Sequence, residues 1–237
     1  MQFLRPIVFG IITLLPFGNT FGCRVYFLLL LSAKLFLDSK NWGWHLLQES
    51  ALNGYFYHGS SVLFDRFDLS HVLEGDGKVK FGYGVYLTSS FKSAAHYSGA
   101  NKSATTHFVY TVEIPELTDD NHIDFKQPVH LDIVKRAEQK LGHTIPQKFT
   151  LDGKDFRKYL AKILGGGSDV RSEKLASEFL NCIGVEFITW PYSWKNPALG
   201  LNVAVLDDKK VKILKVHQVE LDNKQQLIPG SEKEVSL

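Results

Sequence analysis

The sequence predicts an α+β fold, in which strand-like segments lie toward both ends of the globular region and helical segments lie between them. Residues 108–115 alternate in polarity and are rich in β-branched side chains, which is typical of a strand. Residues 171–183 instead place Leu175, Phe179 and Leu180 at helical spacing. The chain has 237 residues, of which 44% are hydrophobic and 22% are charged. It can therefore bury the core of one globular domain of about 150–200 residues and still leave a tail.

Five further segments are predicted to be strands, two before the helical region and three after it. The first two are residues 55–57 and 85–88, and the glycine-rich stretch between them predicts a loop with tight turns. The last three strands are expected at residues 185–190, 202–206 and 210–216. Asp207 and Asp208 are expected to form the turn between the last two.

Helical patterns are predicted over three stretches of the middle region, at residues 129–141, 155–164 and 171–182. Ser168 or Asp169 can cap the third helix at its N-terminus, because their side-chain oxygens can accept hydrogen bonds from its first amides. Gly184 follows at the position where glycine commonly ends a helix.

A shorter helix is expected directly after the second strand. Ser89 or Ser90 can cap its N-terminus. Its packing side is predicted to consist of Ala94, Ala95 and Tyr97.

Three regions are expected along the chain: a hydrophobic N-terminal segment at residues 1–45, a folded domain at residues 50–222 and a polar tail, expected to fray, at residues 223–237. The first region contains apolar runs at residues 7–17 and 25–37, and neither reaches the roughly 20 residues that a straight helix needs to cross a bilayer. It fits an export signal, a membrane anchor that uses both runs, or a start codon placed too far upstream. The first two alternatives, which are favoured together, predict an exported protein or one with a membrane contact through residues 1–40, and the third predicts a cytoplasmic protein.

Composition and motifs exclude several common kinds of function. The formal charge of +2 is close to neutral and no basic stripe stands out, so nucleic acid is not an expected partner. Cys23 and Cys182 are far apart in sequence and outside any metal-binding spacing, which excludes a disulfide framework and a zinc site. Cys182 is expected to be a buried structural thiol. The glycines at 75–84 and 165–167 lack the context of a dinucleotide-binding fingerprint and of a phosphate-binding loop, and neither HExxH nor GxSxG occurs.

Two motifs remain, and together they indicate a nucleotide pocket. The first is Tyr57-His58-Gly59-Ser60, and the second is the block at residues 81–97, which begins Phe-Gly-Tyr-Gly-Val-Tyr-Leu-Thr and contains Tyr86 and Tyr97 eleven residues apart. This pattern resembles the ADP-ribosyltransferase superfamily, in the branch with a His-Tyr-Glu catalytic set. That branch includes the poly(ADP-ribose) polymerases, diphtheria-type toxins and the transferase domains of phage and mobile-element polyproteins. The resemblance spans most of residues 55–216 and is weakest in the middle.

The resemblance implies a split, strongly bent antiparallel β-sandwich with flanking helices and an NAD cleft between its halves. The backbone of Gly59 would pair with the nicotinamide carboxamide, because glycine lets the main chain come close. His58 would donate a hydrogen bond to the adenosine ribose, and Ser60 is a further candidate for ribose or phosphate contacts. Tyr86 and Tyr97 would sandwich the nicotinamide ring, each stack contributing roughly 0.5–1.5 kcal/mol. NAD is therefore the expected co-substrate, and no metal is expected.

The third catalytic position departs from the family pattern, because Asn202 stands where the family has a glutamate at the head of a late strand. Asparagine can hold a ribose hydroxyl but brings no negative charge, and losing one preorganised electrostatic group typically costs about 3 kcal/mol, or a hundredfold in rate. Ala94 is a second departure, since many family members have a serine there.

The resemblance implies mono-ADP-ribosyl transfer from NAD to a protein acceptor, as a toxin or effector would perform it. An NAD glycohydrolase and a catalytically inactive module that binds NAD or ADP-ribose are the alternatives, and Asn202 is the best support for the inactive module. Specificity in the family lies in loops such as residues 62–80 and 189–201. Trp190, Tyr192 and Trp194 form an aromatic cluster in the second loop, which either contacts the acceptor or covers the edge of the core.

Overall fold

The computed structural model describes residues 55–72 and 79–237. The strands are β1 (Phe56–Ser60), β2 (Val85–Thr88), β3 (His107–Glu113), β4 (His122–Asp124), β5 (Phe187–Pro191), β6 (Leu201–Val205), β7 (Lys212–Val219) and β8 (Lys233–Val235). The α-helices of these residues are α2 (Phe91–Ser98), α3 (Leu131–Leu141), α4 (Gly153–Gly165) and α5 (Val170–Cys182). The prediction of an α+β chain is confirmed, because one mostly antiparallel sheet combines with helices that are grouped in sequence.

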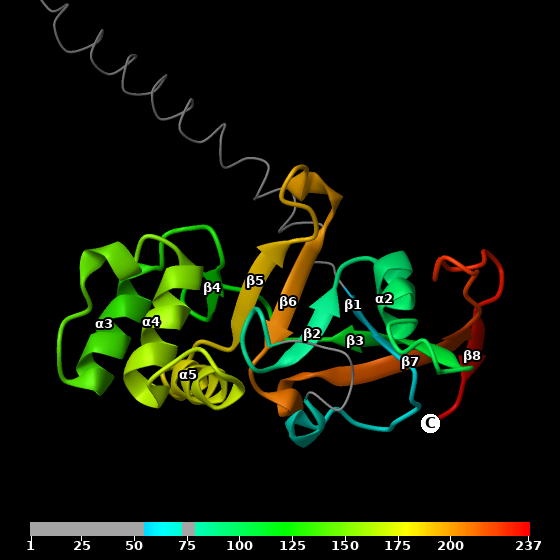
Figure 1. The fold of residues 1–237 in the computed structure, drawn as a ribbon, viewed down its shortest axis with the longest axis horizontal. Coiled ribbons are helices and arrows are strands. Elements are labelled where there is room, and N and C mark those ends of the chain that lie inside the picture. The colour runs from blue at the N-terminus through cyan, green and yellow to red at the C-terminus, as the bar shows by residue number, and fades with distance from the viewer. Residues whose placement is uncertain (1–54, 73–78) are drawn as a thin grey trace, which may run out of the picture. The chain divides into compact units, whose positions relative to one another are not determined.

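The sheet has the strand order β4-β5-β6-β2-β1-β3-β7-β8, and only the β4–β5 pair is parallel. It is nearly divided in the middle, because β1 and β2 pair at a single position, Tyr57 with Thr88. On its other side β1 pairs with β3 along its whole length, from Phe56 to Ser60. On the two sides of this junction the strands run in different directions, as β5 and β6 compared with β3 and β7 illustrate (Figure 1).

Side chains alternate between the two faces of this sheet, and residues directly opposite one another share a face. Thr88 is opposite Asn202, and Tyr86 is opposite Ala204. Tyr86, Thr88 and Asn202 therefore lie on one face. The opposite face carries an apolar core that includes Val85, Leu87, Phe187, Val203 and Val205.

Helix α2 covers the first face over β1 and β3. A Cβ at Gly59 would lie 1.8 Å from the carbonyl oxygen of Ala94, so the helix backbone rests directly on the strand. Ser90 caps α2 by accepting a hydrogen bond from the amide of Ser93 at 3.2 Å, as one of the two predicted caps. Helix packing alone therefore requires the glycine of the His-Gly-Ser motif, independently of any contact between its main chain and a ligand.

Helices α3, α4 and α5 gather at the β4–β5 end of the sheet (Figure 1). They share a core with β5 and β6, to which Phe156, Leu160, Leu180, Ile188 and Ala204 belong. Their ends agree closely with the prediction, because Asp169 caps α5 and Gly184 follows it with a φ of 84°.

Three features differ from the expectations, and the predicted Asp207-Asp208 turn lies between the last two long strands as expected. Strand β4 was not predicted, and the polar tail contributes β8, which pairs with β7 and is therefore not simply frayed. The Asp207-Asp208 turn joins strands that are not neighbours, because β6 pairs with β2 and β5 whereas β7 pairs with β3 and β8. Cys182 is exposed, because it lies on the side of α5 opposite the buried Leu180.

The predicted N-terminal segment at residues 1–45 lies outside the described residues. In the described part of the chain, no helix is both long enough and apolar enough to span a membrane.

Candidate functional site

Tyr86 is held by the turn that precedes its own strand. Its hydroxyl donates to the carbonyl oxygen of Gly82 at 2.9 Å and accepts from the amide of Phe81 at 2.9 Å. Burial raises the pKa of Tyr86 to about 12, although the Phe81 amide opposes this shift. The ring packs edge-on against Trp190, with centroids 5.5 Å apart. Tyr86 is thus a neutral phenol with a fixed ring orientation.

Asn202 lies beside Tyr86 on the same face, between Thr88 of β2 and Trp190 of β5. Only 6% of the residue is exposed, and its amide makes no hydrogen bond with the described residues. Neither amide atom is among the fully buried polar atoms that lack a partner. The amide therefore keeps contact with solvent and has its hydrogen-bonding capacity available for a ligand.

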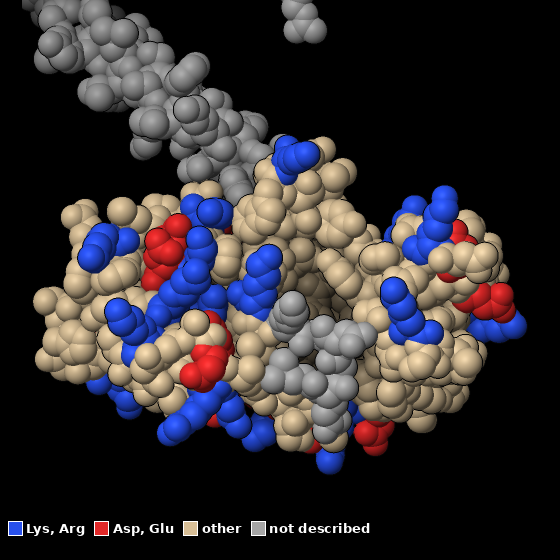
Figure 2. All heavy atoms as spheres, in the orientation of Figure 1, with Lys and Arg blue, Asp and Glu red and all other residues tan. Residues whose placement is uncertain are grey.

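Tyr97 lies on α2 and is 54% exposed. Burial and then the neighbouring phenol of Tyr192 raise the pKa of Tyr97, which places the ring near the connection between β5 and β6. The rings of Tyr86 and Tyr97 make no contact with each other among the described side chains. The space-filling view shows a hollow between α2 and the β5–β6 hairpin, which we call the cleft (Figure 2).

The three aromatic residues of the second predicted specificity loop have different roles. Trp190 is 7% exposed and stacks on Phe81 at a centroid distance of 4.1 Å and an interplanar angle of 3°. It therefore covers the edge of the core. Tyr192 and Trp194 are 44% and 48% exposed, and Lys126 lies 5.8 Å above the ring of Trp194.

His58 links β1 to β2 where the two strands separate. Its Nδ1 lies 2.9 Å from the carbonyl oxygen of Tyr86, and a carbonyl can only accept, so Nδ1 carries the proton. The ring packs against Phe64, Phe67 and Tyr110. Burial lowers the pKa of His58, with the hydrogen bond to Tyr86 opposing, so the imidazole is neutral near pH 7. A neutral ring with its proton on Nδ1 can only accept at Nε2, so His58 cannot make the expected donation to a ribose hydroxyl. Because Tyr57 is opposite Thr88, the side chain of His58 also points to the other face of the sheet, away from that of Tyr86.

Gly59 and Ser60 follow His58 on the part of β1 that pairs with β3 alone. The Ser60 hydroxyl accepts a hydrogen bond from the amide of Val62 at 3.0 Å and so fixes the turn that leaves the strand. Its hydroxyl proton remains available for a ligand oxygen. Both residues therefore lie beside the gap between β1 and β2.

Sequence reasoning missed Thr88 and the stacking of Phe81 on Trp190. Thr88 is 3% exposed on the cleft face, two residues from Tyr86 and opposite Asn202. The sequence could have indicated Thr88, because it is a polar residue two positions after Tyr86 in a strand and therefore shares its face. The Phe81–Trp190 stack joins residues more than 100 positions apart, and no local pattern indicates it.

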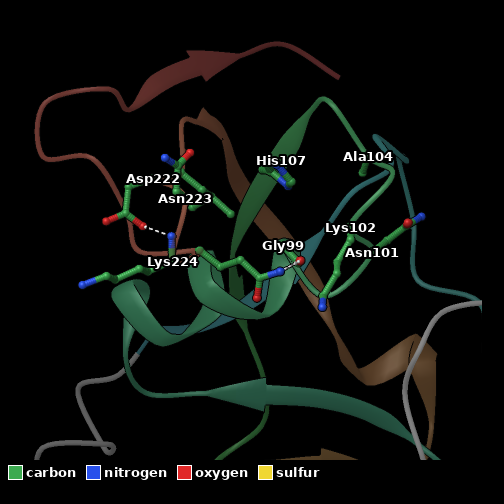
Figure 3. A pocket seen from close by; sticks show the side chains of 10 residues that line it. Gly99, Asn101, Lys102, Ala104, His107, Asp222, Asn223 and Lys224 are labelled. Atoms are coloured by element: carbon green, nitrogen blue, oxygen red, sulfur yellow. Dashed lines mark hydrogen bonds between the residues drawn. The ribbon is translucent and has the colours of Figure 1, made fainter.

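A second pocket, of about 560 Å³, lies at the C-terminal end of α2 (Figure 3). The side chain of Gln225 crosses it to donate a hydrogen bond to the carbonyl oxygen of Gly99 at 2.6 Å. Asp222 accepts from the backbone amide of Lys224 at 2.8 Å on the other side. None of the predicted site residues lines this pocket. In the part of the chain that the structure describes, no group of three or more His, Cys, Asp and Glu side chains could hold a metal ion.

Comparisons of the chain with protein-family models, with curated proteins and with solved structures find no match.

Proposed function

We propose that the chain has an ADP-ribosyltransferase-like fold, binds NAD in the cleft and transfers one ADP-ribose to a protein acceptor. The observation that carries this proposal is that Tyr86 and Asn202 share the face of the sheet on which α2, the helix of Tyr97, is packed. The three residues come from β2, β6 and α2, and the resemblance implies a nicotinamide or ribose contact for each of them. The nearly divided sheet supports the same fold, since it places a gap between β1 and β2.

The nicotinamide end of NAD would be held mainly by stacking and by one strand edge. The ring would lie between Tyr86, whose orientation its two hydrogen bonds fix, and the more exposed Tyr97. The carboxamide would pair with the main chain of Gly59, beside the gap where β1 has left β2. His58, whose side chain lies on the other face of the sheet against Phe67 and Tyr110, would act on the site through the carbonyl oxygen of Tyr86, to which its Nδ1 donates.

The reaction is a substitution at C1′ of the nicotinamide ribose. The bond from C1′ to the ring nitrogen breaks, and its electron pair leaves with nicotinamide, which becomes neutral. A lone pair of the acceptor forms the new bond to C1′, and the acceptor loses its proton. Asn202 would bind a ribose hydroxyl through its free amide, but it cannot stabilise the developing positive charge as a carboxylate would. Slow transfer is therefore expected, and long polymers are not.

Two alternatives use the same cleft. Water would replace the acceptor in an NAD glycohydrolase, and a module without catalysis would retain binding alone. The absence of a carboxylate at position 202 favours the second alternative.

Incubating the full-length protein with NAD labelled in the adenosine and in the nicotinamide separates these functions. Transfer puts adenosine label on protein and releases nicotinamide, hydrolysis releases free ADP-ribose, and a binding module gives a calorimetric signal without either product. Tyr86→Ala should abolish the calorimetric signal, because stacking supplies much of the binding. Tyr159→Ala is the matched control, since that partly buried tyrosine stacks on Phe149 in the helical region. Unchanged NAD binding by Tyr86→Ala, or no binding by the wild-type protein, would contradict the assignment of the cleft.

A further inference from the structure

A buried ion pair lies behind the turn that holds Tyr86. Arg157 of α4 and Glu173 of α5 are 2% and 4% exposed, and their charged groups are in direct contact. The same guanidinium donates through Nη2 to the carbonyl oxygen of Lys80 at 3.1 Å. Arg157 therefore connects the helical region to the turn at residues 80–84.

Several polar backbone groups of this turn have a side chain as partner. The amide of Phe81 and the carbonyl oxygen of Gly82 are both bonded to the hydroxyl of Tyr86. The amide of Tyr83 donates to the hydroxyl of Ser177 on α5 at 2.9 Å. The ring of Tyr86 can keep its orientation only while this turn keeps its place.

Gly82 brings the turn close against the helices. Its φ is +112°, and a Cβ there would lie 2.7 Å from Cδ1 of Ile188 and 3.7 Å from Cδ of Arg157. The charge of Arg157 also acts on the phenol of Tyr86, whose pKa it lowers as the smallest of three influences. The guanidinium, the turn and the phenol thus form one unit.

Stability alone is a weak reason for such a pair. Removing two charges from water is expensive, and hydrophobic residues of similar volume often replace a buried pair without loss. Burial lowers the pKa of Arg157. Its Nε is buried without an acceptor, and Nη1 and the Glu173 Oε2 that it contacts are buried without a hydrogen bond. What a hydrophobic residue cannot do is hold Glu173 and the carbonyl oxygen of Lys80 at the same time, which the planar guanidinium does.

We propose that Arg157 and Glu173 are positioning residues for Tyr86. Glu173 orients the guanidinium, the guanidinium holds the turn at Lys80, and the turn fixes the phenol through Phe81 and Gly82. The pair acts through Tyr86 and touches neither NAD nor the acceptor. The expected effect of the ion pair on NAD binding rests on the proposed function. Its expected effect on the structure of the turn does not.

The decisive variant is Arg157→Met/Glu173→Leu, which removes both charges and keeps similar side-chain volumes. Lys215→Met/Glu234→Leu is the matched control, because it removes an ion pair of 3.4 Å between β7 and β8, at the edge of the sheet and three or more strands from β2. The first variant should fold cooperatively and bind NAD at least ~10-fold more weakly, as expected when an ordered aromatic contact is lost. The control should stay within about twofold of the wild-type Kd.

A double-mutant cycle separates positioning from a general structural effect. In a Tyr86→Phe background the hydroxyl no longer ties the ring to the turn, so removing the ion pair should then weaken NAD binding by less than about threefold. Full additivity of the two changes, or a wild-type Kd in the first variant, overturns the proposal. If the double substitution fails to fold, Arg157→Lys replaces it in the cycle. That variant keeps a cation beside Glu173, but its compact ammonium lacks the planar fork that also holds Lys80.

Hydrogen exchange at the amide of Phe81 tests the same inference without NAD. This amide is bonded to the Tyr86 hydroxyl and should exchange at least ~10-fold faster without the ion pair, but not in the control. If the wild-type protein does not bind NAD, the proposed function fails, and this measurement still decides the inference. Unchanged protection of Phe81 overturns it.

Discussion

An alanine at position 59 would put a methyl carbon 1.8 Å from the carbonyl oxygen of Ala94 and 2.8 Å from the amide nitrogen of Ser98. Both are backbone atoms of α2, so no change of rotamer relieves the overlap. Ordinary contact begins near 3.4 Å, which requires α2 to move away from β1 by about 1.6 Å. Overpacking of this kind typically costs 1–3 kcal/mol, and we expect about 3 kcal/mol here.

For a chain of this size, that loss lowers the midpoint of thermal unfolding by about 6–12 °C. Because α2 carries Tyr97, the same shift should weaken NAD binding, and a displacement of about 1 Å can reduce a rate roughly a hundredfold. Scanning calorimetry and NAD titration of Gly59→Ala measure both effects. Gly167→Ala is the control, since its Cβ would find its nearest neighbour at 3.5 Å, and it should stay within about 1 kcal/mol of the wild-type protein. A wild-type melting temperature for Gly59→Ala would refute the direct packing of α2 on β1.

Three further predictions follow from the cleft. The pKa of His58 in the folded state lies below its ordinary 6.5. As the pH falls below 6.5, the imidazole is protonated in the unfolded chain before it is protonated in the folded chain, so the free energy of unfolding decreases. His58→Asn can still donate to the Tyr86 carbonyl, and in urea unfolding at pH 7 and pH 5 it should lose less stability than the wild-type protein; an equal loss would contradict the buried neutral imidazole. Tyr86→Phe leaves Phe81 and Gly82 without their hydroxyl partner and should cost about 1–2 kcal/mol in thermal unfolding, and it should weaken NAD binding about as much as loss of the Arg157–Glu173 pair; unchanged stability would argue against the anchored phenol. Asn202→Glu should accelerate nicotinamide release about a hundredfold in a labelled-NAD assay, and no acceleration would mean that this position does not face the reacting ribose.

Local patterns predicted the helices well, because the signals that start and end them lie within a few residues. Asp169 caps the N-terminus of α5 with its side-chain oxygen, and Gly184 follows the C-terminus with a positive φ. Both devices depend only on the residue and its neighbours in sequence. Strand β4 escaped prediction because three residues are too few for an alternation, and only the parallel pairing with β5 makes them a strand. Strand β8 escaped for a related reason, since its polar residues pair with β7 at the edge of the sheet.

The sequence by itself determined the residue types of the candidate site. It also determined that Tyr86 lies on a strand and Tyr97, eleven residues later, on the helix that follows, because both elements are set by local patterns. Only the tertiary structure decided what those residues face. Asn202 comes beside Tyr86 through the register of β6 on β2, and His58 is a neutral acceptor because Tyr86 and a buried aromatic cluster surround it. These outcomes follow from strand pairing between segments that are distant in sequence, because that pairing sets how far each group is buried and which hydrogen bonds it makes.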